Sequence, residues 1–146
     1  MLLILSLACH LLLMINVIKR RKIALPVWSE QICIVFDFAQ SLLVVEIENT
    51  SEISRKYYAL TGEPPLFRAR RLRNLGVQTL ICGALSHPLL AILRSYGITV
   101  IPYICGHVDE VLHAYMKGDL SKPYFRLPGC PSYARGRRGR RGGLTL

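Results

Sequence analysis

The second half of the chain repeats one unit, in which an apolar strand ends in cysteine and glycine and an amphipathic helix follows. The strands expected at 77–82 and 98–104 are each followed by a Cys-Gly step, at Cys82-Gly83 and at Cys105-Gly106. Helical periodicity then begins and ends at a further glycine in both cases. Strands joined by helices run parallel through right-handed crossovers. We therefore expect a parallel α/β sheet with both Cys-Gly steps at one rim.

The first half of the chain predicts a β-meander. Three strand-like runs, at 22–27, 41–48 and 53–60, are separated by turn-forming residues. An amphipathic helix is expected at 66–75, where the apolar residues recur every three positions and the other face is arginine-rich and solvated. Together the two halves predict a three-layer α/β sandwich on a five-stranded mixed sheet with helices on both faces.

The first 20 residues form an apolar leader ahead of the folded domain, which we place at 21–127. The run from Met1 to Ile18 is almost wholly apolar, and a basic cluster follows it. A cleaved signal peptide is disfavoured, because no positive charge precedes the run and no small-residue cleavage site follows it. Two readings remain open. Residues 1–18 are a membrane anchor that holds the domain on the cytoplasmic side, or translation starts at Met14; both place the domain in the cytoplasm.

Residues 128–146 form an Arg/Gly-rich tail that we expect to be disordered. This segment contains five arginines and no acidic residue, so it carries +5 of the formal net charge of +10. It has too few apolar residues to fold. Cys130 lies within it, in a Pro-Gly-Cys-Pro sequence that favours neither a helix nor a central strand.

The cysteines exclude two common classes of small protein. The five cysteines are widely spaced and no CxxC pair is present. This pattern is neither the disulfide framework of a secreted domain nor a zinc finger, and it is typical of a reducing compartment.

The sequence gives little support to an enzyme. It contains no GxSxG, P-loop or dinucleotide-binding motif. Nucleases need several carboxylates around divalent metal ions. The expected rim offers only Asp37 and Asp109. We therefore predict a non-catalytic protein.

Several segments, in order over residues 22–143, resemble the dinitrogenase iron–molybdenum cofactor biosynthesis family, the NifX-like cofactor carriers. They are residues 22–28 (KIALPVW), 35–37 (VFD), 75–84 (LGVQTLICGA), 97–102 (GITVIP), Cys105-Gly106 and 125–130 (FRLPGC), ahead of the Arg/Gly tail. The resemblance implies a ribonuclease-H-like fold with strand order 3-2-1-4-5. It also implies a protein that binds an iron–sulfur or iron–molybdenum cofactor, or a precursor, and exchanges it with cofactor-assembly proteins.

The strand order implied by this resemblance places the first and fourth strands side by side, so that Trp28 and Cys82-Gly83 flank a crevice. We predict Cys82 as a metal ligand whose thiolate is stabilised by the N-terminus of the next helix. Cys105, with Gly106 and His107, forms a second candidate, since a thiolate and a neutral imidazole both suit iron. Cys130 is the third candidate thiol.

A binding module of another class is the alternative. The arginine-rich helix face and the RG tail could serve a small regulatory or RNA-associated protein. The basic face lacks the interleaved aromatic residues of a nucleic-acid site, so nucleic acid is the less favoured partner. Membrane contact is expected only through residues 1–18.

Overall fold

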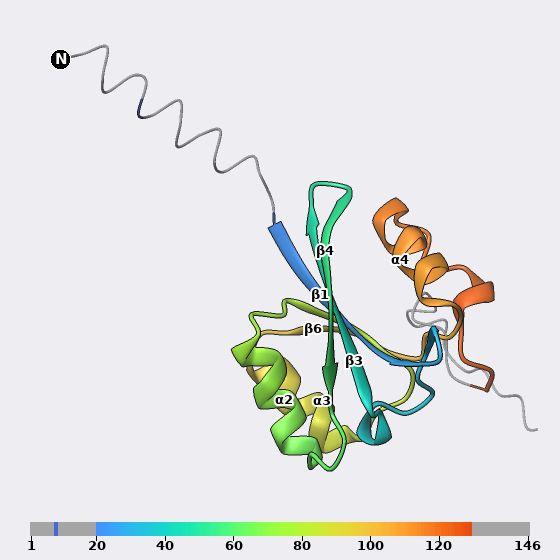
Figure 1. Cartoon of the computed structure of the whole chain (residues 1–146). Helices are drawn as coiled ribbons and strands as arrows, with labels where there is room; N and C mark the ends of the chain where they lie inside the picture. The colour runs from blue at the N-terminus through green and yellow to red at the C-terminus, as the bar shows by residue number, and fades with distance from the viewer. Residues whose placement is uncertain (1–7, 9–19, 130–146) are drawn as a thin grey trace, which may run out of the picture.

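The computed structural model describes Ala8 and residues 20–129. Within 20–129 the elements are β1 (Arg20–Trp28), β2 (Gln31–Ile32), the 3-10 helix η1 (Phe36–Phe38), β3 (Ser41–Glu48), β4 (Ser51–Ala59), α2 (Pro65–Asn74), β5 (Thr79–Ile81), α3 (His87–Ser95), β6 (Thr99–Ile101), α4 (Val108–Lys117) and the 3-10 helix η2 (Pro123–Phe125) (Figure 1). The predicted leader, the tail and Cys130 fall almost wholly outside the described residues and stay predictions. No helix in the described part of the chain is long and apolar enough to cross a membrane.

One mixed sheet runs through the domain. Its strands lie in the order β4-β3-β1-β5-β6, and β2 pairs with β1 beside this path. β1, β3 and β4 are antiparallel neighbours, whereas β5 and β6 run parallel to β1. The predicted mixed α/β sheet is confirmed. The predicted count of five strands is wrong, because β2 is a sixth, and the observed numbering therefore differs from the expected order 3-2-1-4-5.

The extra strand β2 depends on a tight turn that the sequence pattern did not predict. Ser29 and Glu30 link β1 to β2 with φ values of 48° and 65°. Such a two-residue hairpin turn normally uses Asn or Gly at these positions. It pairs Val27 with Ile32 and Trp28 with Gln31, and so returns the chain along the end of β1.

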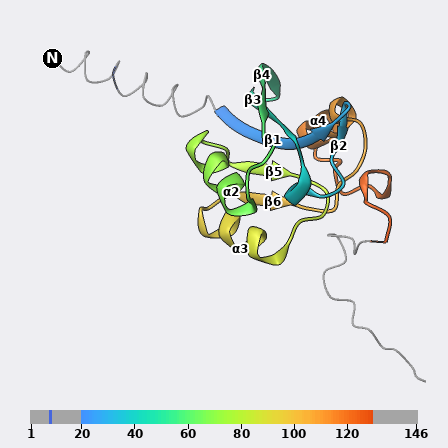
Figure 2. The same ribbon diagram turned by 60° about the horizontal axis from the view of Figure 1, so that its bottom comes forward.

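Alternate side chains of β1 supply two separate cores, as the period of two in a strand requires. Ile23, Leu25 and Val27 pack on the side of α4. Ala24 packs with Leu80 on the side of α2 and α3. Figures 1 and 2 show α4 on the other side of the sheet from α2 and α3. Because burying one large aliphatic side chain contributes about 1.5–3 kcal/mol, both helical layers are held by the sheet.

One arginine of α2 is not on the solvated face that we predicted. The Arg68 side chain is buried, and its guanidinium donates hydrogen bonds to the carbonyl oxygens of Glu63, Phe36, Ala39 and Leu60. Burial lowers the pKa of Arg68. Because a buried cation needs hydrogen-bond acceptors, these carbonyl groups tie α2 to η1 and to the end of β4.

Candidate functional site

The carboxyl ends of β1, β5 and β6 lie at one edge of the sheet, because these strands are parallel. We call this edge the rim and define it as residues 28–35, 82–84, 103–107 and 124–126. Isolated bridges join its segments, between Gln31 and His107, Val35 and Ala84, and Ile104 and Arg126. As expected, the first strand pairs with the strand that ends in Cys82. Both Cys-Gly steps therefore belong to the rim.

Cys82 is fully buried beneath the rim. It belongs to the core on the side of α2 and α3, and its exposed fraction is 0%. Burial, together with the negative charge of Asp37, raises the pKa of the Cys82 thiol to about 12. The expected stabilisation of a thiolate by the next helix is therefore wrong. The Asp37 carboxylate accepts a hydrogen bond from the backbone N–H of Ser86 at 2.9 Å, and so occupies the helix N-terminus itself.

Gly83 provides room for this chain's own backbone. A Cβ atom at Gly83 would lie 2.3 Å from the carbonyl oxygen of Ile34 and 2.7 Å from that of Cys33. The backbone N–H of Ala84 donates to the same Ile34 oxygen at 2.7 Å. On the Gly83 side, the predicted crevice is therefore filled by the segment that follows β2.

Cys105 lies in a different environment, partly exposed at the rim. Its thiol donates to the carbonyl oxygen of Arg126 at 3.1 Å, and its backbone N–H donates to that of Phe125 at 2.9 Å. Partial burial raises the pKa of the Cys105 thiol. A thiol in such a position can reach an external ligand after it leaves one carbonyl group and loses its proton.

His107 follows Cys105 at the N-terminus of α4. Its Nδ1 accepts a hydrogen bond from the backbone N–H of Asp109 at 3.3 Å, and its Nε2 lies 3.5 Å from a carboxylate oxygen of Glu30. Gly106, between the two side chains, has a φ of +122°, which an L side chain rarely adopts. This glycine turns the chain so that Cys105 faces the segment 124–126 while His107 faces Glu30.

Trp28 is 75% exposed at the end of β1. With Glu30, Tyr57 and Val108 it lines a hollow of about 280 Å³. Glu30 and Tyr57 had not been predicted. Glu30 enters the site through the unexpected β1–β2 turn, and Tyr57 lies on β4, two strands away from β1. Neither carries a sequence signal, because the untypical turn places Glu30 and only the folded sheet brings Tyr57 to Trp28.

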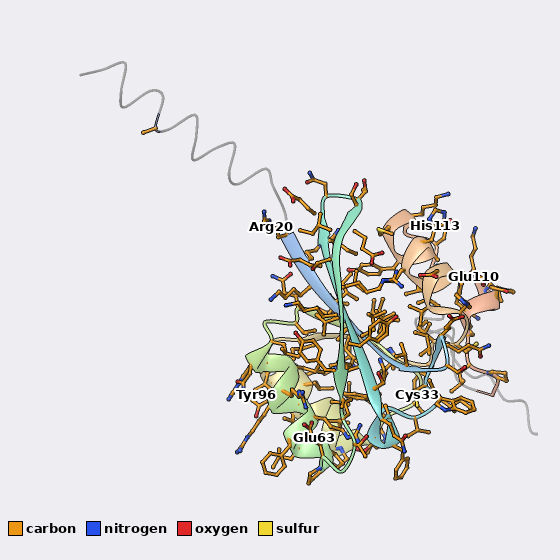
Figure 3. All side chains as sticks on the ribbon, in the orientation of Figure 1. Arg20, Cys33, Glu63, Tyr96, Glu110 and His113 are labelled. Carbon is orange, nitrogen blue, oxygen red and sulfur yellow. The ribbon has the colours of Figure 1, made fainter. Side chains whose placement is uncertain are left out.

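The rim thus brings together some predicted residues and separates others. Trp28, Cys105, Gly106 and His107 are all at or near its surface, whereas Cys82 is buried in the α2–α3 core and Cys130 lies outside the described residues. Among the residues that the structure describes, no group of three or more His, Cys, Asp or Glu side chains could hold a metal ion. Cys33 is a further partly exposed thiol, and like Tyr96 it packs against the core on the side of α2 and α3; Figure 3 labels both residues.

The fold and the rim define a small α/β binding domain with a thiol and an imidazole at the carboxyl ends of its parallel strands. The sequence model of the dinitrogenase iron–molybdenum cofactor family matches residues 19–118, which is more than half of the chain. The chain belongs to this family, as the resemblance predicted, and the membership supports a role in binding or biosynthesis of a metallocofactor. The match ends before the segment 125–130.

Solved structures show the same fold. PH0822 is 16% identical with a TM-score of 0.64, and the alignment covers 66% of this chain and 89% of that one. MJ0327 of Methanocaldococcus jannaschii is 17% identical with a TM-score of 0.60, and the alignment covers 69% of this chain and 92% of that one. The apo orange protein of Desulfovibrio gigas is 19% identical with a TM-score of 0.58, and the alignment covers 68% of this chain and 89% of that one. At these identities the likeness concerns the fold alone. A search of curated proteins found no match.

Proposed function

We propose that this protein is a non-catalytic carrier of an iron–sulfur or iron–molybdenum-type cluster, or of a precursor, and that it exchanges this cargo with cofactor-assembly proteins in the cytoplasm. The observation that carries the proposal is the partly exposed thiol of Cys105 on the rim of a domain from this family, with the imidazole of His107 two residues further on and next to Glu30. A thiolate and a neutral imidazole are ligands that iron accepts.

The environment of this pair suits temporary binding. To bind iron, Cys105 must give up its hydrogen bond to Arg126 and lose a proton from a thiol whose pKa is raised. Binding therefore releases a proton, and affinity increases with pH. The lost hydrogen bond and the lost proton both lower the affinity for the cluster. A lowered affinity favours transfer of the cluster to a partner over permanent storage.

Cys82 and Cys130 are further proposed ligands of lower rank. Cys82 can meet a cluster only if the segment that packs on Gly83 moves away and the thiol loses its proton. Cys130 would have to come from outside the described residues. Cys105 is therefore the residue on which the proposal depends most.

The two carboxylates that flank the rim, Asp37 and Asp109, support a non-catalytic role. Asp37 caps the backbone of Ser86, and Asp109 forms an ion pair with Arg55 at 2.9 Å. Neither carboxylate is placed to share a pair of divalent metal ions as nuclease chemistry needs.

The alternative RNA-associated function receives no support from α2. Of its arginines, Arg68 points into the protein and Arg71 is paired with Glu63. Arg73 stacks on Tyr96, with 4.5 Å between the guanidinium carbon and the ring centroid. These three arginines of α2 are therefore engaged within the protein, and α2 offers fewer free arginines for binding phosphate than its sequence indicated.

Anaerobic reconstitution with iron and sulfide tests the proposal. The parent protein is expected to take up iron and to show thiolate-to-iron charge-transfer absorbance. Cys105→Ser should lower bound iron several-fold. Cys33→Ser is the matched control, because Cys33 is also a partly exposed thiol bonded to a carbonyl oxygen, that of Val35. Equal iron uptake by the parent and by Cys105→Ser would refute the rim site.

A further inference from the structure

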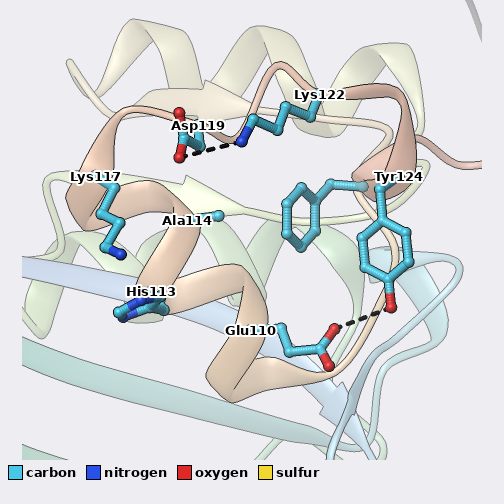
Figure 4. Close-up of a pocket in the computed structure, with 8 residues that line it drawn as sticks. Glu110, His113, Ala114, Lys117, Asp119, Lys122 and Tyr124 are labelled. Carbon is cyan, nitrogen blue, oxygen red and sulfur yellow. Dashed lines mark hydrogen bonds and ion pairs between the residues drawn. The ribbon is translucent and has the colours of Figure 1, made fainter.

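A hollow separate from the predicted site lies between α4 and the segment 119–125. Its volume is about 380 Å³, within the range of small-molecule sites. Phe125 and Ala114 line it together with charged side chains from both segments, and Figure 4 labels Ala114 among these charged groups. We call it the α4 pocket. None of the predicted site residues lines it.

The carboxylates of the α4 pocket already have partners. Glu110 accepts a hydrogen bond from the Tyr124 hydroxyl at 3.2 Å. Asp119 forms an ion pair with Lys122 at 3.4 Å. Both interactions tie the side chains to the wall, as the dashed lines of Figure 4 show. Lys122 therefore offsets the charge of Asp119, while Glu110 keeps its negative charge and faces the Tyr124 hydroxyl.

Two basic side chains remain at the other end of the pocket. His113 and Lys117 are one helical turn apart on α4, so they lie on the same face, and Figure 4 shows them next to each other. Within the described part of the chain, neither side chain makes a hydrogen bond or an ion pair, whereas the neighbouring Glu110 and Asp119 side chains do. A lysine ammonium can donate three hydrogen bonds and an imidazole at least one.

We propose that the α4 pocket binds a small organic anion that joins an apolar or aromatic body to a carboxylate or phosphate group. The anionic group contacts Lys117 and His113, while the body lies on Phe125 and Ala114. Specificity comes from this combination, because the apolar surface adds binding energy that a bare inorganic ion lacks.

The pocket is next to the rim. The carbonyl oxygen of Phe125 accepts the backbone hydrogen bond of Cys105 at 2.9 Å. A ligand that packs against the Phe125 ring therefore contacts a residue that is hydrogen-bonded to Cys105, the proposed cluster ligand. The proposal does not depend on cluster binding, since every group it uses is present without metal.

Titration of the ¹⁵N-labelled full chain, followed by NMR, tests the proposal. The probes are benzoate, phenyl phosphate, acetate, inorganic phosphate and benzylamine. Benzoate or phenyl phosphate should shift amide signals of α4 and of residues 119–125, and the stronger of the two tells whether the pocket takes a carboxylate or a phosphate. Acetate and inorganic phosphate should bind more weakly, and benzylamine should cause no matching shifts.

Variants connect the binding to the basic pair. Lys117→Gln should weaken binding about three- to fivefold, the range of a solvent-accessible ion pair, and Lys117→Glu should abolish it. Lys56→Gln is the control, because Lys56 is an exposed lysine on β4. The proposal is overturned if benzylamine binds as well as benzoate, if acetate binds as well as benzoate, or if Lys117→Gln and Lys56→Gln behave alike. Iron reconstitution, measured separately, decides the carrier function independently of these outcomes.

Discussion

The ends of β5 and β6 carry the same tripeptide, Ile-Cys-Gly, yet the fold treats them in opposite ways. Cys82 is fully buried with a pKa of about 12, while Cys105 is partly exposed and bonded to one carbonyl group. Gly83 touches the backbone of another segment, whereas the nearest atom to a Cβ at Gly106 would be 3.7 Å away. Identical local sequence therefore does not predict the accessibility of a thiol.

The difference comes from the position of each tripeptide relative to its strand. Cys82 directly follows Ile81, the last residue of β5, and its backbone N–H still bonds to Ile101 of β6, so its side chain alternates into the core. Cys105 stands four residues after β6, beyond Tyr103, whose φ of 62° turns the chain. The thiol then meets the segment 124–126 and the solvent instead of the core.

The largest expected effect concerns the two glycines. Gly83→Ala should lower the free energy of unfolding by about 3 kcal/mol or more, because the new Cβ overlaps backbone atoms that cannot move aside. Gly106→Ala should cost about 1–2 kcal/mol, which is the strain of its left-handed φ. Urea unfolding of both variants measures the contrast. Equal costs would show that the segment over Gly83 shifts easily, and would make Cys82 more accessible than the structure indicates.

A second contrast concerns the cysteines. Cys82→Ser should lower the free energy of unfolding by about 1–3 kcal/mol, because a hydroxyl group then enters an apolar core. Cys105→Ser should change it by less than about 0.5 kcal/mol, since serine can donate to the Arg126 carbonyl in the same way. Thermal or urea unfolding without iron measures both changes in unfolding free energy. A larger loss for Cys105→Ser than for Cys82→Ser would contradict the buried and partly exposed environments of these two thiols.

The last expected effect is a pH dependence. The thiol pKa is 9.0 for an ordinary cysteine and about 12 for Cys82. Above pH 9 the unfolded chain loses this proton while the folded chain keeps it, so the stability is fully present below pH 9 and is lost as pH rises. The loss is at most about 1.4 kcal/mol per pH unit.

The Cys82→Ala variant isolates this effect from the other groups that titrate in alkali. The difference in unfolding free energy between the parent and Cys82→Ala should shift against the parent between pH 9 and pH 11. Parallel curves for the two proteins would mean that Cys82 ionises at an ordinary pKa in the folded state.

The candidate site was predicted in part. Cys105 and His107 were placed at one rim because parallel strands share an edge, Trp28 was placed there through the strand order that the resemblance implied, and the structure has all three there. Glu30 was missed, since the turn that carries it uses residues untypical of such turns. The burial of Arg68 was missed too, because its acceptors are carbonyl groups of two separate segments, 36–39 and 60–63, and leave no trace in the pattern of side chains.

The sequence by itself determined the local elements and the family. Apolar periodicity specifies strands and helices because each element must bury one face, and that requirement acts over a few neighbouring residues. Only the tertiary structure decided which of the two Ile-Cys-Gly steps is buried, which arginine is internal and which charges surround the α4 pocket. These properties depend on contacts between segments far apart in the chain, such as Ile34 over Gly83 and Arg126 beside Cys105.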